Sequence, residues 1–116
     1  MDDDQTDALF AALAHRDRRR MLDLLLQAPG MTVKAMASHF PMSRIAVMKH
    51  LKVLEQAGLL QSEKQGRERH LFLDPTPLQV VYDRWTTELS AFWASRMADI
   101  KARVEARVNA KQNRHA

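Results

Sequence analysis

The chain has 116 residues, of which 18 are basic and 14 acidic, so its formal net charge is +4, and it contains no cysteine. This length supports one small domain with its own core. The lack of cysteine excludes disulfides and thiolate metal sites. No apolar run approaches the length of a membrane span, and no signal-peptide pattern is present. We therefore expect a cytoplasmic protein with no membrane partner.

The charge is distributed unevenly along the chain. Residues 1–7 include four aspartates, whereas residues 8–116 carry 18 basic and 10 acidic side chains. A basic body favours a polyanion such as nucleic acid as the partner. We expect a disordered acidic N-terminus over residues 1–7, a folded domain over 8–108 and a flexible polar tail over 109–116.

Helical periodicity dominates the first forty residues. We predict a first helix over about 6–14 and a second that continues to about Gln27, where Pro29-Gly30 ends it firmly. Thr32 is placed to cap a third, short helix, because its hydroxyl can accept a hydrogen bond from the first helical turn. A short turn then leads into a fourth helix, which makes the two a helix-turn-helix candidate.

The fourth helix has two contrasting faces. Ser43 is a natural N-cap and Gly58 a natural stop. Helical spacing places an apolar stripe on one side, formed by Val47, Leu51 and Leu54. The other side and its flank carry Arg44, Ile45, Met48, Lys49 and Lys52. Such a helix fits the major groove of DNA, although an ordinary amphipathic helix with a solvated lysine face explains the same pattern.

A β-hairpin is predicted directly after this helix. Two short predicted strands between Leu59 and Leu73 flank a tight turn at Gln65-Gly66-Arg67. Its basic side chains near the tip are Lys64, Arg67 and Arg69. A helix-turn-helix followed by a basic hairpin is the winged-helix arrangement, in which the tip lies over phosphates or an adjacent minor groove. The predicted fold is mainly α with a small β-hairpin, a winged helix-turn-helix.

A long last helix is predicted over about 77–108. Its apolar stripe includes Trp85, Leu89, Phe92 and Trp93. This is more apolar area than so small a core can cover, so we expect the surplus to meet a second copy of the chain. An aromatic box for a small ligand, built from Trp85, Phe92 and Trp93, is the alternative interpretation.

Three segments resemble the ArsR (arsenical-resistance-regulator) family of small bacterial winged-helix repressors. They run over residues 13–22, 42–59 and 66–75, and the middle one, with His-Leu-Lys-Val-Leu-Glu followed by Ala-Gly-Leu, is the most specific. The resemblance covers about residues 8–97. It implies a homodimer joined by the first and last helices and bound to a partly palindromic operator of double-stranded DNA. The two recognition helices would enter successive major grooves, roughly 34 Å apart.

The resemblance also implies roles for individual residues. By position, the family's base-facing residues fall on Ser43, Arg44, Ile45, Met48 and Lys49. We expect Arg44 to read guanine, and Ile45 and Met48 to contact thymine methyl groups. Lys49 and Lys52 are expected to hold phosphates. The family usually has serine where Met48 stands, which changes the chemistry available there. The implied dimer interface draws on Leu9, Phe10, Leu13, Trp85, Leu89, Phe92 and Trp93.

The metal sites of the family's best-known members have no counterpart in this sequence. One such site needs cysteines, and another pairs Asp with His along the last helix, where residues 78–114 contain no histidine. Asp83 and Asp99 therefore have no histidine in that stretch with which to form the family's metal site. The five histidines show no ligand spacing, and His50 lies nearer the buried stripe than the outer face. We predict no metal and no cofactor, while a metal site assembled across a dimer stays open.

The sequence thus predicts a sequence-specific, homodimeric transcriptional regulator, most simply a repressor. It does not predict an enzyme, because no nucleophile–base pair, phosphate loop or metal triad is present. Two alternatives stay open. One is a winged-helix protein-interaction module without operator specificity. The other is a regulator gated by an unknown small-molecule or protein effector, with the region of Trp85, Phe92 and Trp93 as the ligand site.

Overall fold

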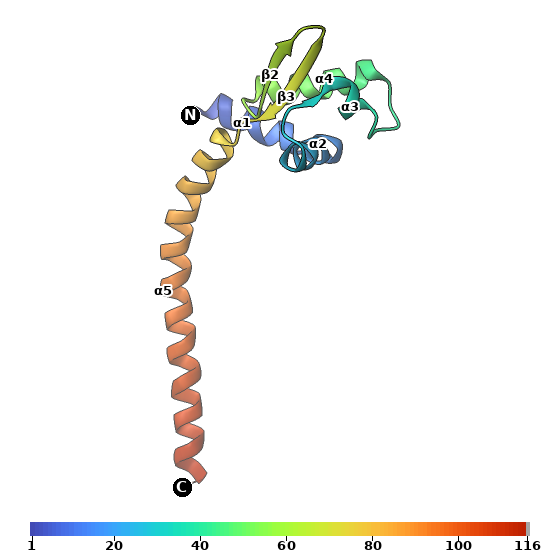
Figure 1. Ribbon diagram of the computed structural model, residues 1–116. Coiled ribbons are helices and arrows are strands. Elements are labelled where there is room, and N and C mark those ends of the chain that lie inside the picture. Colours follow the sequence, from blue (N-terminus) through green and yellow to red (C-terminus); the bar gives the residue numbers. More distant parts are fainter. Residues whose placement is uncertain (116) are drawn as a thin grey trace. The chain divides into compact units, whose positions relative to one another are not determined.

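The computed structural model describes residues 1–115, and the chain divides into two units, Met1–Val81 and Tyr82–Ala116. The first unit holds four helices and a three-stranded sheet (Figure 1). In chain order the elements are α1 (Asp3–Leu13), α2 (Arg16–Gln27), β1 (Met31–Thr32), α3 (Val33–Ala37), α4 (Arg44–Gln56), β2 (Leu60–Gln65), β3 (Glu68–Leu73) and α5 (Thr76–His115). None of the helices within residues 1–115 combines the length and the hydropathy that a membrane crossing requires.

The acidic N-terminus is helical, so the prediction of disorder over residues 1–7 was wrong. Helix α1 begins at Asp3 behind a capping box. The Asp2 carboxylate accepts a hydrogen bond from the Gln5 backbone N–H at 2.8 Å, and the Gln5 side-chain oxygen accepts one from the Asp2 N–H at 2.9 Å. Acidic residues are also favoured in a first helical turn, because the exposed N–H groups there carry partial positive charge.

Helix α4 lies at the centre of the first unit, where it contacts α1, α2, α3 and β2. The core around it is apolar, and no polar or charged side chain among the described residues is buried. Its largest fully buried side chains are Leu9, Met21, Leu25, Met36, Leu54, Leu59, Leu71 and Val47. The position of α4 is therefore set by apolar burial on several sides at once.

The sheet has the order β1-β3-β2, with both pairs antiparallel. The predicted hairpin is present, and Gly66 in its turn adopts φ of 66°, a conformation that favours glycine. Strand β1 was not predicted, because two residues are too few to show a strand pattern. It forms because Gly30, at φ of 84°, turns the chain toward β3, where the Gly30 N–H donates to the Leu71 carbonyl at 2.9 Å.

Helix α5 begins where the prolines predicted a break. The Asp74 carboxylate accepts a hydrogen bond from the Thr76 backbone N–H at 3.0 Å. Hydrogen bonds from the Thr76 side chain and backbone lower the pKa of Asp74. The helix continues through His115, past the predicted end at 108. Four of these seven residues, Ala110, Lys111, Gln112 and Arg114, are good helix formers. The predicted flexible tail over 109–116 is thus helical as far as His115, and Ala116 lies outside the described residues.

We predict that Leu25→Ala lowers the free energy of unfolding by about 2–5 kcal/mol, because Leu25 is 1% exposed and its removal leaves a cavity in the core. Leu26 is the matched control, since it is adjacent in sequence and 66% exposed. Leu26→Ala should change the free energy of unfolding by no more than about 0.5 kcal/mol. Urea denaturation of the two variants measures both values, and equal effects would contradict the placement of α2.

Candidate nucleic-acid interface

Helix α4 presents a mixed basic and apolar face to solvent. The Ser43 hydroxyl caps it by accepting a hydrogen bond from the Ala46 N–H at 3.1 Å. Val47, Leu51 and Leu54 are buried, as the periodicity predicted. On the opposite side Ile45 is 69% and Met48 51% exposed. The remaining residues of the predicted reading face, Ser43, Arg44, Lys49 and Lys52, are exposed as well.

The hairpin carries its cations on the face that continues toward α4. Residues two apart in a strand share a face, so Leu60, Ser62 and Lys64 of β2 lie together. Lys64 is paired directly with Arg69 across the two strands. The Arg69 guanidinium donates a hydrogen bond to the Ser62 hydroxyl at 3.1 Å. Arg67, in the turn itself, is exposed, so all three predicted hairpin cations are accessible to a partner.

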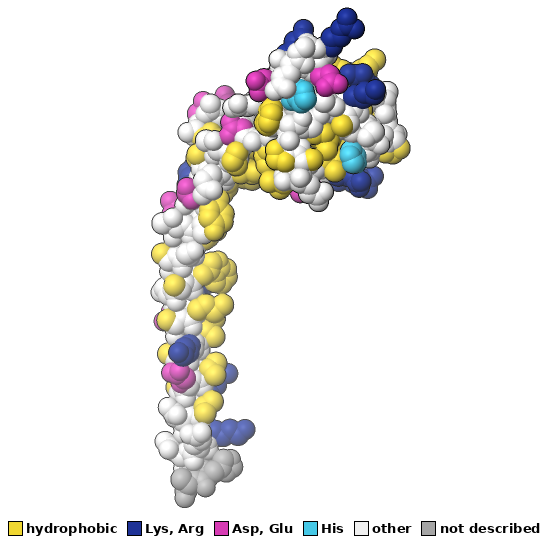
Figure 2. Space-filling view, in the orientation of Figure 1, with side chains coloured by type: hydrophobic (Ala, Val, Ile, Leu, Met, Phe, Trp, Pro, Cys, Tyr) yellow, Lys and Arg dark blue, Asp and Glu magenta, His cyan; other side chains and the backbone are white. Residues whose placement is uncertain are grey.

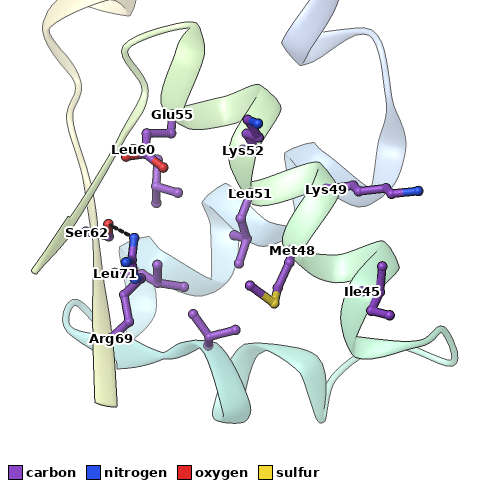
Figure 3. A pocket seen from close by; sticks show the side chains of 11 residues that line it. Ile45, Met48, Lys49, Leu51, Lys52, Glu55, Leu60, Ser62, Arg69 and Leu71 are labelled. Atoms are coloured by element: carbon purple, nitrogen blue, oxygen red, sulfur yellow. Dashed lines mark hydrogen bonds between the residues drawn. The ribbon is translucent and has the colours of Figure 1, made fainter. Parts of the chain in front are cut away.

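A groove separates α4 from the hairpin (Figure 3). It has a volume of about 520 Å³ and contains six apolar side chains. Its lining residues are Val33, Ile45, Met48, Lys49, Leu51, Lys52, Glu55, Leu60, Ser62, Arg69 and Leu71. In Figure 3, Met48 and Leu51 point from α4 toward the groove, whereas Lys49 points away from it. The helix face and the hairpin face therefore meet across an apolar depression, which the sequence analysis did not predict.

This geometry agrees with the comparisons with known proteins. A family model described as a helix-turn-helix domain matches residues 13–63. The HTH-type transcriptional regulator Rv2034 of Mycobacterium tuberculosis is 38% identical over 87 residues, which are 75% of this chain and 77% of that protein. The crystal structure of the ArsR family transcriptional regulator RHA00566 matches with a TM-score of 0.71 and 34% identity, over 82% of this chain and 96% of that one. This chain belongs to the ArsR family.

The ArsR-family regulator is thus a DNA-binding transcriptional regulator with a winged helix-turn-helix fold, and both predictions are confirmed. A further relative is the transcriptional repressor SdpR of Bacillus subtilis, 34% identical over 71 residues, which cover 61% of this chain and 78% of that protein. The residues predicted to contact DNA lie on α4 and on the hairpin that follows it, the two elements that define this fold.

The residues predicted for the dimer interface fall into two groups. Leu9 is fully buried in the core of its own unit, so its predicted place in an interface was wrong, whereas Phe10 on the same helix is 42% exposed. Leu13 packs partly against the core. In the second unit, Trp85, Leu89, Phe92 and Trp93 are all exposed, between 37% and 53%. The helical stripe predicted over α5 is therefore accessible, and Figure 2 shows its apolar side chains in yellow.

The aromatic side chains of α5 contact one another and nearby arginines. The rings of Phe92 and Trp93 meet edge to face, with centroids 5.7 Å apart. The Arg96 guanidinium lies 4.3 Å from the Phe92 ring centroid, and that of Arg84 lies 5.8 Å from Trp85. These contacts place exposed aromatic rings beside arginine side chains along one helix. The ligand role predicted for this region stays a prediction.

The fold brings together a cluster that the sequence analysis missed. His15, Asp17 and His50 each offer one ligand atom within 4.8 Å of the others. Arg18 also belongs to the cluster, because its guanidinium nitrogen Nη1 lies 3.2 Å from Nδ1 of His50. The same guanidinium donates to the backbone carbonyls of Ala11 and Ala12. Arg18 thus joins the C-terminal end of α1 to the middle of α4.

Hydrogen bonds within the cluster engage a ring nitrogen of each histidine. Arginine can only donate, so Nδ1 of His50 accepts and its ring is neutral. Nδ1 of His15 likewise accepts from the Asp17 N–H at 3.1 Å. Both lone pairs are therefore engaged, and the Arg18 charge sits beside them. Burial, with the charges of His15 and Arg18, lowers the pKa of His50, while Asp17 opposes this. No local spacing signal could relate residues 18 and 50.

We predict that acidification below pH 6.5, the ordinary pKa of histidine, lowers the free energy of unfolding in part through His50. Because the pKa of His50 is lowered in the folded protein, the unfolded chain binds this proton first as the pH falls. Protonation also removes the lone pair that accepts from Arg18. His50→Asn keeps a side-chain acceptor but does not titrate, so its stability should fall less on acidification.

Urea unfolding between about pH 7.5 and about pH 5 measures this difference. The control is His39→Asn, since His39 is exposed and lies outside the cluster. It should keep the wild-type pH dependence. A His50→Asn profile as steep as that of the wild type would contradict the assigned role.

Proposed function

We propose that this ArsR-family regulator is a homodimeric repressor that binds a partly palindromic operator and blocks a promoter. The observation that carries the proposal is the exposed face of α4. On this face, side chains able to contact bases are exposed to solvent, and the opposite face of the same helix is buried in the core. Burial of Val47, Leu51 and Leu54 leaves this helix one orientation, so its outer face is preorganised for the major groove.

The exposed residues of α4 that were predicted to contact DNA each have a proposed part in binding the operator. Arg44 contacts guanine, because its guanidinium can bond both O6 and N7 in the major groove. Ile45 and Met48 contact thymine methyl groups, which gives these apolar side chains a reason to be exposed. Lys49 and Lys52 bind phosphates. Ser43 caps the helix, whose first N–H groups favour a phosphate nearby.

The hairpin supplies the second set of proposed phosphate contacts. Lys64 and Arg69 are paired across the strands, and like charges in that position lower the stability of a hairpin. A polyanion beside them relieves the repulsion. Arg67 at the turn extends the same basic surface. This arrangement supports a wing that follows the DNA backbone, and it gives binding that weakens as salt rises.

The dimer is proposed to form through α5, with Phe10 of α1 contributing. An exposed stripe that contains two tryptophans and a phenylalanine is larger than isolated surface residues require, and a second copy covers it. Self-association also places two α4 helices on one operator, which matches a palindrome. The relative SdpR, by its name a transcriptional repressor, supports repression rather than activation.

We predict that Arg44→Ala weakens binding to the cognate operator by about 1–3 kcal/mol while it leaves binding to random duplex nearly unchanged. The reason is that a lost guanine contact affects only sequences with guanine at that position. Fluorescence anisotropy on the duplex upstream of the regulator's own reading frame, and on a shuffled duplex, measures both affinities. An equal loss on the two would assign Arg44 to the phosphates.

Lys64→Gln gives the contrasting result expected of a phosphate contact. It should weaken binding to both duplexes alike and reduce the slope of log K against log salt by about one. If the wild-type protein bound the two duplexes with equal affinity, the proposal that it recognises a specific operator would be wrong.

We predict that Phe92→Ala shifts the chain toward monomer and weakens operator binding together with it, because the two half-sites are then bound separately. Sedimentation equilibrium at micromolar concentrations measures the association. Leu26→Ala serves as the control, since it removes an exposed apolar side chain of α2 without touching the stripe. A Phe92→Ala protein that stays dimeric and fully active would place the interface elsewhere.

A further inference from the structure

The groove between α4 and the hairpin has an apolar floor. Val33, Leu51, Leu60 and Leu71 line it, and each is between 1% and 7% exposed. They come from α3, α4, β2 and β3, so the floor is built by four elements and belongs to the folded unit. Met48, which is 51% exposed, covers one side of it. A groove of about 520 Å³ lies within the range of small-molecule sites in proteins.

The rim of the groove is predominantly cationic. Lys52 borders it from α4 and Arg69 borders it from β3, while Glu55 is the one acid among its lining residues. Lys49 also lines the groove, but its side chain points away from it (Figure 3). Arg69 uses one N–H group on Ser62, which leaves other donors of its guanidinium for a ligand. A ligand with a hydrocarbon chain to contact the apolar floor and one anionic group to contact the cations of the rim therefore complements the whole groove.

DNA alone does not satisfy both parts. In the major groove its apolar groups are thymine methyls, which can meet Ile45 and Met48 at the outer edge. A methyl group is much smaller than the groove of about 520 Å³, so we expect DNA to leave most of the floor unfilled when phosphates occupy the rim. An amphipathic anion makes use of the floor that DNA leaves, and it needs the same cations.

We propose that this groove binds a free medium-chain carboxylic acid, with its tail over Leu51, Leu60 and Leu71 and its carboxylate at Lys52 and Arg69. The bound acid excludes DNA from α4, because it neutralises cations and covers Met48 on the face that reads the operator. This second consequence rests on the proposed function, whereas the binding of the acid does not. The regulator is then released from its operator by direct competition, with no change of dimer geometry required.

The test begins with calorimetric titration of decanoate into the full-length protein without DNA. We expect saturable binding of one decanoate per chain. Acetate, which lacks the tail, should not bind. 1-Decanol, which lacks the charge, should bind about two- to fivefold more weakly than decanoate, as the loss of an exposed ion pair predicts. Many equivalents of decanoate per chain, or tighter binding of 1-decanol, would overturn the proposal.

Two pairs of variants locate the site. Met48→Glu places a carboxylate in the lining and should weaken decanoate about tenfold or more. Leu26→Glu, an equally exposed leucine position on α2, should leave binding unchanged. Arg69→Gln should weaken binding about two- to fivefold, whereas Lys34→Gln, an exposed cation outside the groove, should not change it. Thermal unfolding confirms that each variant is folded. Binding that survives Met48→Glu would place the acid elsewhere and overturn the proposal.

The competition is tested on the operator duplex. Decanoate should displace the duplex from the wild-type protein with an inhibition constant equal to the dissociation constant from calorimetry. Decanoate that binds in the groove while the duplex stays bound would overturn the competition. If the protein bound no duplex at all, the proposed function would fail, and the calorimetric arm would still decide whether the groove binds the acid.

Discussion

The burial of one face of α4 is the constraint on which the rest of the structure depends. Val47, Leu51 and Leu54 are covered by helices on several sides and by the sheet. Because a helix repeats every 3.6 residues, fixing this stripe also fixes the outward direction of Arg44, Ile45 and Met48. The core therefore does two things at once: it stabilises a small domain, and it orients the side chains that are proposed to read DNA.

Several weaker interactions set the details around this helix. The Ser43 cap defines where α4 begins, and the link from Arg18 to His50 ties its middle to the end of α1. The hairpin is attached through the floor of the groove, where Leu60 and Leu71 pack beneath its basic side chains. Protonation of His50, or binding of a ligand in the groove, thus acts directly on α4, the helix that carries the residues proposed to read DNA.

The two faces of the regulator that stay exposed have different characters. On the first unit, cations accompany exposed apolar residues on α4 and the hairpin, a combination suited to both phosphates and thymine methyl groups. Helix α5 carries a stripe of exposed large apolar residues along its length, which suits self-association. DNA binding and dimerisation are therefore assigned to separate surfaces, and each proposed activity has variants that leave the other surface unchanged.

The sequence by itself determined the features that have local causes. The two faces of α4, the caps at Thr32 and Ser43 and the turn at Gly66 depend on residues a few positions apart, so periodicity and turn chemistry predicted them. The family likeness rested on the same segments. The capping box at Asp2 is also local, and its signal in the sequence was overlooked.

Only the tertiary structure decided that Leu9 is buried, that β1 joins the sheet, that Arg18 reaches His50 and that an apolar groove separates α4 from the hairpin. Each of these joins residues distant along the chain, and such contacts follow from the packing of whole elements, which no local pattern records.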